Sequence, residues 1–437
     1  MSNTDTKCPL PWMHTSIQTS GALRSCCIAS DLVRHDGNIV NIKNTSLTEV
    51  INSSSMQELR NSMRRGEKHS NCSTCWKDEE NGKISKRIYE TSYLKDTLTN
   101  TIQHGDSISI QQHNTLDYDS EPTRYLDIQL GVGNVCNLKC RTCSPYCSTK
   151  WIDEFKHRTG EQKYEFNNLE VDESITDSKF WEELDEWSST VKRLEIMGGE
   201  PFYMKEFHIL IDKLIANGNS KHITLAMSTN GTIFNEKLCN KIRENFKSLG
   251  LNVSIDGIGE HFDFLRHGNN WDKVKKNLDG FYEMFRKHEN FNMGATITIS
   301  QINMYYIREI HEFFEQNYPD IDHGTHYSSF NIFNNIIHYP SYYSSNTMPA
   351  DLKEHYLHKI KYPSNYGLSD WNQEKFKEQI QPLINHVLQP TSYTDWRNFV
   401  RETNAADKYR NENFQKTFPE LWEMFEPYWH IMEDINW

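Results

Sequence analysis

The sequence predicts an α/β protein built on an incomplete barrel of parallel strands, a partial (β/α)6 TIM-like barrel. Three observations lead to this fold: short segments alternate apolar and polar residues, helical periodicity separates them, and the repeat occurs six times rather than eight. Strand–helix repeats of this length imply parallel strands joined by crossover helices. The expected strands cover residues 125–130, 191–197, 222–228, 251–255, 293–299 and 325–333.

Each strand is identified by its pattern. In the first, Leu126, Ile128 and Leu130 alternate with Asp127 and Gln129, as in a strand with one buried face. The segments between strands place apolar residues at i, i+3 and i+4, most clearly over 207–215, 271–285 and 307–314. In barrels of this kind the chemistry lies at the carboxyl ends of the strands.

The barrel is expected to occupy residues 121–344, between two segments of different character. Residues 1–95 contain half of the ten cysteines, with strand-like pieces near Ile17 and Ile39 and a helix over 47–63. Residues 96–120 are polar and predict a linker. Residues 345–437 are helical and rich in aromatics, and no motif indicates their role.

The charge balance excludes some classes of protein. With 47 Lys and Arg against 60 Asp and Glu, the net charge is −13, which argues against a large nucleic-acid footprint. Apolar runs stay well below the roughly 20 residues of a membrane span, and the first residues lack a secretory pattern. We therefore expect a cytoplasmic protein. Cysteines in that reducing compartment favour metal binding over disulfides.

One short loop concentrates cysteines directly after the first strand. The run GNVCNLKCRTCSP spaces Cys136, Cys140 and Cys143 as C-x3-C-x2-C. A [4Fe–4S] cluster normally takes four thiolates, so three ligands leave one iron open for catalysis. Two alternatives use Cys147 as a fourth ligand: a zinc site or a simple electron-transfer cluster.

Glycines and polar residues follow the next three strands. Paired glycines let a backbone approach a ligand closely, and inward polar side chains at strand ends can meet a bound molecule. Each motif alone is a weak signal, but together they occur at successive strand ends. The residues are Gly198, Gly199, Glu200, Asn230, Ser254, Asp256 and Arg266.

The combined set of motifs resembles the radical S-adenosylmethionine (SAM) superfamily. CNLKCRTC, MGGEP, STNG, VSIDG and TITISQIN occur in that family's order over roughly residues 122–335. The resemblance implies that Cys136, Cys140 and Cys143 hold a [4Fe–4S] cluster that binds SAM. It also implies reductive cleavage of SAM, with the resulting 5′-deoxyadenosyl radical abstracting a substrate hydrogen. A one-electron donor such as flavodoxin or ferredoxin would reduce the cluster.

The same resemblance assigns roles to the strand-end residues. The SAM amino group would be held by Gly198, Gly199 and Glu200. Ser254 and Arg266 would bind the ribose or the carboxylate of SAM, and Asn303 is a weaker candidate for the same role. Contacts to SAM or to the substrate would come from Asn230 and Asp256.

The amino-terminal cysteines form a second set. On chemistry alone, Cys8, Cys26, Cys72 and Cys75 favour structural zinc, which C-x2-C pairs commonly bind. The spacing C-x12-G-x4-C resembles instead the SPASM and twitch auxiliary-cluster domains of radical SAM enzymes, which implies a second [4Fe–4S] cluster. Cys27 is an alternative to Cys26 as ligand, and nearby His14 is expected at the surface.

The substrate is the least determined part of the prediction. By analogy with peptide-maturing members of the SPASM and twitch families, we expect a peptide or protein substrate. The alternatives are a small molecule such as a sugar or nucleoside, and a non-catalytic iron–sulfur or zinc protein. The sequence indicates neither a catalytic acid or base nor the oligomeric state.

Overall fold

The computed structural model describes residues 6–80, 82, 84–93, 110–111, 115–159, 178–318, 321–322, 330–361 and 370–433. All six expected strands are present within this part of the chain. They are β7 (Asp127–Gly133), β8 (Arg193–Gly198), β9 (Thr224–Thr229), β10 (Ser248–Ser254), β11 (Phe291–Ile299) and β13 (Phe330–Ile336).

These strands lie in one open sheet. Over the described residues its order is β12-β13-β11-β10-β9-β8-β7-β1-β2, so the six barrel strands are neighbours in chain order. The short strands β1 (His14–Ile17), β2 (Leu23–Arg24) and β12 (Ile321–Asp322) extend the two edges. Among the described residues the two edge strands, β12 and β2, do not pair with each other, so the prediction of a partial barrel is confirmed.

The amino-terminal segment contributes directly to this sheet. Strand β1 pairs in parallel with β7, and His14 lies opposite Asp127. Strand β2 returns antiparallel to β1. Two further short pairs are β3 (Arg34–His35) with β4 (Asn38–Ile39), and β5 (Ile110–Gln111) with β6 (Thr115–Leu116). Most of the expected linker, 96–120, lies outside the described residues, and the division of the chain near residue 95 stays a prediction.

The chain forms two compact units. The first contains Met1–Val135, Glu165–Met227 and Glu236–Leu249, and the second contains Cys136–Tyr164, Ser228–Asn235 and Gly250–Trp437. The helices of the first unit are α1 (Leu10–Met13), α2 (Leu47–Ile51), α3 (Ser54–Arg64), α4 (Ser73–Glu80), α5 (Lys86–Tyr93), α7 (Lys179–Glu182), α8 (Leu184–Ser188), α9 (Lys205–Ala216) and α10 (Glu236–Asn245).

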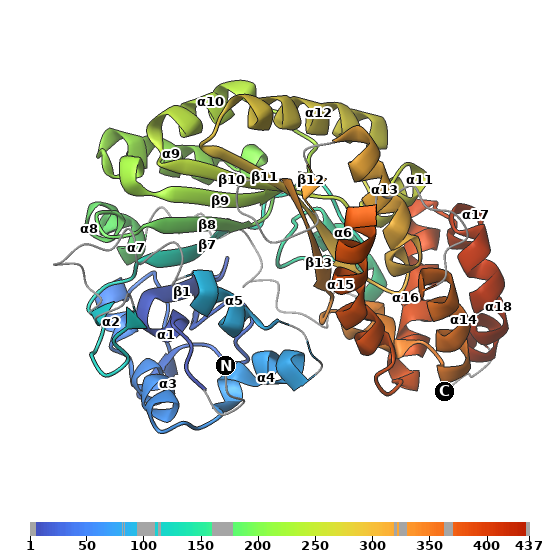
Figure 1. Cartoon of the computed structure of the whole chain (residues 1–437), viewed down its shortest axis with the longest axis horizontal. Coiled ribbons are helices and arrows are strands. Elements are labelled where there is room, and N and C mark those ends of the chain that lie inside the picture. Colours follow the sequence, from blue (N-terminus) through green and yellow to red (C-terminus); the bar gives the residue numbers. More distant parts are fainter. Residues whose placement is uncertain are drawn as a thin grey trace. The chain divides into compact units, whose positions relative to one another are not determined.

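In the first unit, α8 and α9 lie beside the strands β7, β8 and β9 (Figure 1). The side chains of Leu194 and Ile196 on β8 are buried, as are Phe207 and Leu210 on α9. Burial of the alternate strand positions and of one helix face explains the two periodicities in the sequence. The expected helix over 47–63 is divided into α2 and α3, because Ser53 begins a new helix in extended conformation.

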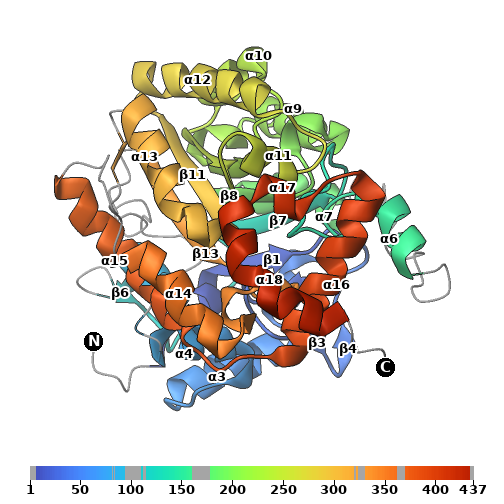
Figure 2. The ribbon, with the colours of Figure 1, turned by 90° about the vertical axis from the view of Figure 1, so that its right-hand side faces the viewer.

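The helices of the second unit are α6 (Trp151–Thr159), α11 (Glu260–Leu265), α12 (Trp271–Lys287), α13 (Ile307–Asn317), α14 (Ala350–Lys361), α15 (Asp370–Val387), α16 (Tyr393–Arg410), α17 (Phe414–Thr417) and α18 (Pro419–Glu433). Figure 2 shows α14, α16 and α18 grouped together. Aromatic rings fill this group, and Phe414 stacks on Trp429 at 5.2 Å between centroids. The aromatic-rich carboxyl-terminal sequence therefore forms a packed helical core.

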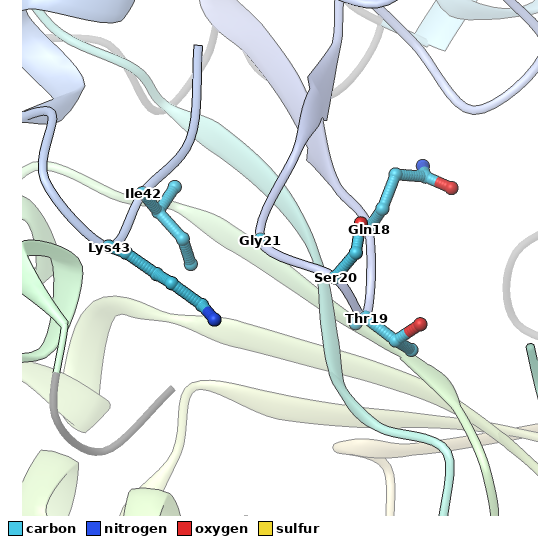
Figure 3. A pocket seen from close by; sticks show the side chains of 7 residues that line it. Gln18, Thr19, Ser20, Gly21, Ile42 and Lys43 are labelled. Carbon is cyan, nitrogen blue, oxygen red and sulfur yellow. The ribbon is translucent and has the colours of Figure 1, made fainter. Parts of the chain in front are cut away.

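A tight turn joins β1 to β2 and explains the glycine in the spacing C-x12-G-x4-C. The Gly21 amide donates to the Gln18 carbonyl at 2.9 Å, and Gly21 has φ +80°. The turn encloses a cavity of about 10 Å³, room for about one water molecule, beside Ile42 and Lys43 (Figure 3). A Cβ at position 21 would lie 2.5 Å from Asn41 Oδ1.

Replacing Gly21 with alanine should therefore destabilise the first unit by about 1–3 kcal/mol, because a non-glycine residue is strained at positive φ. Urea denaturation would measure the loss. Gly37 is the matched control, since its φ is +84° but a Cβ there meets nothing within 4 Å. Equal losses at both positions would show that the contact with Asn41 contributes nothing.

In the part of the chain that the structure describes, no helix is both long and apolar enough to cross a bilayer.

Candidate iron–sulfur and SAM site

The cysteine loop begins in the second unit where β7 has ended. Cys136, Cys140 and Cys143 are each half-buried and free of disulfides. The Cys143 amide donates to the Cys140 carbonyl at 3.0 Å, which folds the C-x2-C part of the loop into a turn. Burial raises the pKa of the Cys140 thiol to about 11, although the charge of Arg266 lowers it. Binding of a metal would displace such protons, since the thiolate is the ligand.

An amide network surrounds the first cysteine. Asn230 Nδ2 lies 3.7 Å from Cys136 Sγ and also donates to Asn137 Oδ1 at 2.8 Å. Thr232 fixes the Asn230 side chain by donating its hydroxyl to Oδ1 at 2.6 Å. Hydrogen bonds to cluster sulfurs adjust the reduction potential of iron–sulfur clusters. The structure therefore places Asn230 beside the candidate ligand Cys136, and its predicted contact with SAM or the substrate stays a prediction.

An ion pair lies at the end of β10. Arg266 Nη1 and Asp256 Oδ2 are 2.6 Å apart, and both side chains are buried. The other Asp256 oxygen accepts from the Thr298 amide at 2.8 Å. Burial lowers the pKa of Arg266, but the charges of Cys140 and Asp256 outweigh it and raise that pKa. Arg266 is thus fixed in its charged form beside Cys140.

Arg266 retains a free donor in this arrangement. Its Nε is buried and has no hydrogen-bond partner among the described residues. An unsatisfied buried donor of a charged group is costly, and a bound carboxylate would satisfy it. Asn303 donates to the backbone carbonyl of Asp256 at 3.0 Å, so it helps to position Asp256. Ser254 is the last residue of β10 and is half-buried.

The glycine motif lies in the first unit, where backbone packing accounts for both glycines. The Gly199 amide donates to the Gly133 carbonyl at 2.8 Å, and the Glu200 amide donates to Val135 at 2.9 Å. A Cβ on Gly198 would lie 2.2 Å from the Gly133 oxygen, and one on Gly199 would lie 2.1 Å from the Val135 oxygen. The motif therefore supports the segment that leads into Cys136. Buried Glu200 caps the turn after β8 by accepting from the Phe202 amide at 3.3 Å.

Four amino-terminal cysteines come together in the first unit. Cys26 and Cys72 pack against the buried core that contains Cys8. Burial raises the pKa of Cys8, and the nearby Cys26, Cys72 and Cys75 raise it further. Burial likewise raises the pKa of Cys26 and of Cys72 to about 12. Three separate segments thus supply one thiol-rich site.

Cys27 has different neighbours from Cys26. Its thiol shares a hydrogen bond with the Gln129 side chain and lies near the charges of Lys86 and Glu195. Lys86 in turn pairs with Glu90 at 3.0 Å. Cys27 also lies near Cys26, but it is Cys26 that packs against the core containing Cys8.

Across the described residues, no group of three or more His, Cys, Asp or Glu side chains converges closely enough to hold a single metal ion. A zinc site draws its ligands to about 2.0–2.3 Å from one centre, whereas a cubane distributes its thiolates over four irons. The chemistry of the thiol donor sets fits an iron–sulfur cluster, whose irons are held by Cys thiolates.

A buried ionic network in the first unit was not anticipated from the sequence. Asp127 on β7 accepts from His14 Nδ1 at 2.8 Å and from Arg193 at 2.5 Å, and Arg193 also pairs with Glu90 at 2.9 Å. The expectation that His14 is a surface residue is wrong, because it is 1% exposed. The alternation of Asp127 and Gln129 with apolar residues predicted a polar strand face, but it did not predict the partners of these side chains.

Together, a partial barrel with three cysteines on the first strand's loop defines an iron–sulfur enzyme of the radical SAM class. Comparison with known families agrees: residues 130–314 match the radical SAM superfamily, and residues 8–76 match the iron–sulfur cluster-binding SPASM domain. The chain therefore contains a radical SAM domain, preceded by a SPASM domain.

Two groups of relatives show how far this similarity extends. GTP 3′,8-cyclase of Helicobacter pylori (strain ATCC 700392 / 26695) is 26% identical over 197 residues, which is 44% of this chain and 53% of the relative. An uncharacterized protein of Methanocaldococcus jannaschii is 29% identical over 185 residues, 41% of this chain and 55% of the relative. The chain thus spans about half the length of the curated relatives it matches.

Similar solved structures include anSMEcpe with bound AdoMet, at 17% identity and a TM-score of 0.33 over 53% of this chain and 57% of that one. Another is SuiB of Streptococcus suis bound to S-adenosylmethionine, at 15% identity and a TM-score of 0.31 over 68% of this chain and 61% of that one.

Proposed function

We propose that this protein reductively cleaves SAM at a [4Fe–4S] cluster held by Cys136, Cys140 and Cys143, and modifies a peptide or protein by a radical route. The observation that carries the proposal is the juxtaposition of Cys140 with the Asp256–Arg266 ion pair. It combines a thiolate donor set with a buried cation that has a free N–H donor. An open cluster iron and a carboxylate-binding arginine are what SAM requires.

The residues around the loop would bind and orient SAM. When bound, the cluster and SAM supply a carbon-centred radical that abstracts a hydrogen atom from the substrate. Arg266 would bind the SAM carboxylate through Nε, while its ion pair with Asp256 fixes the orientation of the guanidinium group. The carboxylate of Glu200 would accept from the SAM ammonium group, and Ser254 suits a ribose hydroxyl. Gly198 and Gly199 would hold the SAM amino group together with Glu200, and Asn230 would donate to Cys136.

The SPASM segment would hold a second [4Fe–4S] cluster on Cys8, Cys26, Cys72 and Cys75. Four thiols suffice for full ligation, so the role we propose for this cluster is electron relay or structure. A small one-electron donor of the flavodoxin or ferredoxin type would reduce the first cluster. The reducing cytoplasm suits both clusters.

A nucleotide is the second candidate substrate, because several relatives are named GTP 3′,8-cyclase. A triphosphate needs several cations that are not already neutralised. On the polar face of the first unit, Arg193 pairs with Asp127 and Glu90, and Lys86 pairs with Glu90. This charge balance favours a substrate with little negative charge, such as a peptide.

Anaerobic reconstitution with iron and sulfide tests the proposal. We expect about eight irons per chain if both clusters are cubanes, and 5′-deoxyadenosine on addition of SAM and dithionite. Adding GTP, or peptides encoded beside the gene, would identify the substrate by a new product mass. About four irons together with bound zinc would refute the second cluster alone, whereas a fully loaded protein that never cleaves SAM would refute the activity.

A further inference from the structure

The carboxyl-terminal helices have no role in the proposed chemistry, yet they contact the cysteine loop through a buried arginine. Arg141 lies between Cys140 and Cys143, and its side chain is fully buried. Its guanidinium pairs with Asp407 and, at 2.5 Å, with Glu412. It also lies 3.6 Å above the centre of the Phe264 ring. A buried guanidinium is tolerated only when it is paired in this way.

Asp407 and Glu412, here called the acidic pair, are themselves fixed at the end of α16. Asn411 ends that helix in the left-handed conformation, with φ 55°. The Glu412 amide donates to the Asp407 carbonyl at 3.0 Å, and the Phe414 amide donates to Asp407 Oδ2 at 2.6 Å. The acidic pair is therefore presented by a rigid helix end rather than by a free loop.

A second set of contacts joins the same helix end to the loop. Glu412 also pairs with His267 at 2.5 Å, and the His267 carbonyl accepts from the Lys139 amide at 3.1 Å. Lys139 Nζ lies 3.1 Å from Glu154, and Arg410, the last residue of α16, lies 2.9 Å from Glu154. Both basic side chains of the loop thus form ion pairs that link it to α16. Arg141 pairs with Asp407 directly, whereas Lys139 and Arg410 both pair with Glu154.

We propose that the acidic pair is a positioning device for the SAM-binding cluster. By holding Arg141, it fixes Cys140 and Cys143 where they ligate iron, and it neutralises a positive charge beside the cluster. The carboxyl-terminal region would then determine the lifetime and the reduction potential of the cluster, although it supplies no ligand. The inference rests on the proposed cluster, but the fixing of the loop is testable without iron.

The first experiment uses the full-length protein without a cluster. Hydrogen exchange of amides 136–148 is measured in the wild type and in the variant D407N/E412Q. We expect about tenfold or faster exchange in the variant, because a buried guanidinium left without carboxylates no longer fixes the loop. Unchanged exchange in the loop would overturn the proposal, whether or not the loop binds iron.

The second experiment uses the reconstituted protein. In D407N/E412Q we expect iron to pass to a chelator about tenfold faster, as for other residues that orient metal ligands. The cluster potential should rise, because the Arg141 charge is no longer neutralised. Should that variant fail to fold, D407N and E412Q alone each retain one carboxylate, and D407E should restore slow release. Wild-type potential and iron release in both single variants would contradict the role.

A matched control is available in the same helices. Glu420 on α18 pairs with Lys359 on α14 at 2.8 Å and is exposed. The variant E420Q should keep the wild-type potential, spectrum and exchange rates. If E420Q changed the cluster as much as D407N/E412Q, the effect would reflect general loosening of the helices, and the specific role of the acidic pair would be refuted.

Discussion

Replacing Cys136, Cys140 and Cys143 together with alanine should abolish formation of 5′-deoxyadenosine from SAM. Without the three thiolates no cluster can assemble at this loop, so there is neither an electron source nor an open iron for SAM. The loss should reach the detection limit rather than a fraction of the activity, because the metal centre itself is removed. The measurement is 5′-deoxyadenosine formed under dithionite, alongside the iron content.

The same variant distinguishes the two proposed clusters. It should retain about four irons, bound by the amino-terminal cysteines. The single variants C147A and C239A are the controls: Cys147 is the alternative fourth ligand, and Cys239 is an isolated buried thiol on α10. Both should keep SAM cleavage. Cleavage surviving in the triple variant would disprove the ligand assignment, and its loss in C147A would show that Cys147 is required at this loop.

Replacing Asp127 with asparagine should destabilise the first unit by about 3–5 kcal/mol. The substitution leaves Arg193 and His14 buried around a neutral amide, and breaking a buried ion pair from one side is strongly destabilising. Urea denaturation at neutral pH would measure the change. Asp212, which pairs with Lys241 and is 61% exposed, is the control in the same unit. Its asparagine variant should lose at most about 1 kcal/mol.

The acid stability of the protein should depend on the same network. Burial raises the pKa of Asp127, but the charge of Arg193 and the contact with His14 outweigh it and hold that pKa well below its usual range. A carboxylate with a lowered folded pKa contributes stability above its unfolded pKa of about 4, and the contribution is lost as the pH falls further. The wild type should therefore lose stability below about pH 4 more steeply than D127N. Parallel curves would show that Asp127 is not the group responsible.

Local sequence patterns were sufficient for much of the fold and for the radical SAM and SPASM domains. The alternation around Ile128 and the helical spacing around Leu210 follow from burial of one face, so they are visible without any partner. The loop spacing of Cys136, Cys140 and Cys143 is a local constraint as well. Gly21 belongs to the spacing C-x12-G-x4-C, and the structure supplies the reason for a glycine there, a positive φ beside Asn41.

Partners distant in the sequence were not predictable in this way. Asp127 and His14 are 113 residues apart, and the sequence placed His14 at the surface. The contact of Cys27 with Gln129 likewise depends on how an amino-terminal loop meets strand β7. A charged residue in a single sequence is most often exposed, so burial with a partner can be recognised only from the fold.

The sequence by itself determined the class of this protein: a partial barrel, a loop with three cysteines and a second cysteine set ahead of it. Each of these is encoded within a few residues, where periodicity and ligand spacing restrict the possibilities. Only the tertiary structure decided which charges are neutralised, above all at Arg141, whose partner Asp407 lies 266 residues away. The physical reason is that ion pairing depends on distance and burial in space, and neither is set by the neighbouring residues in the chain.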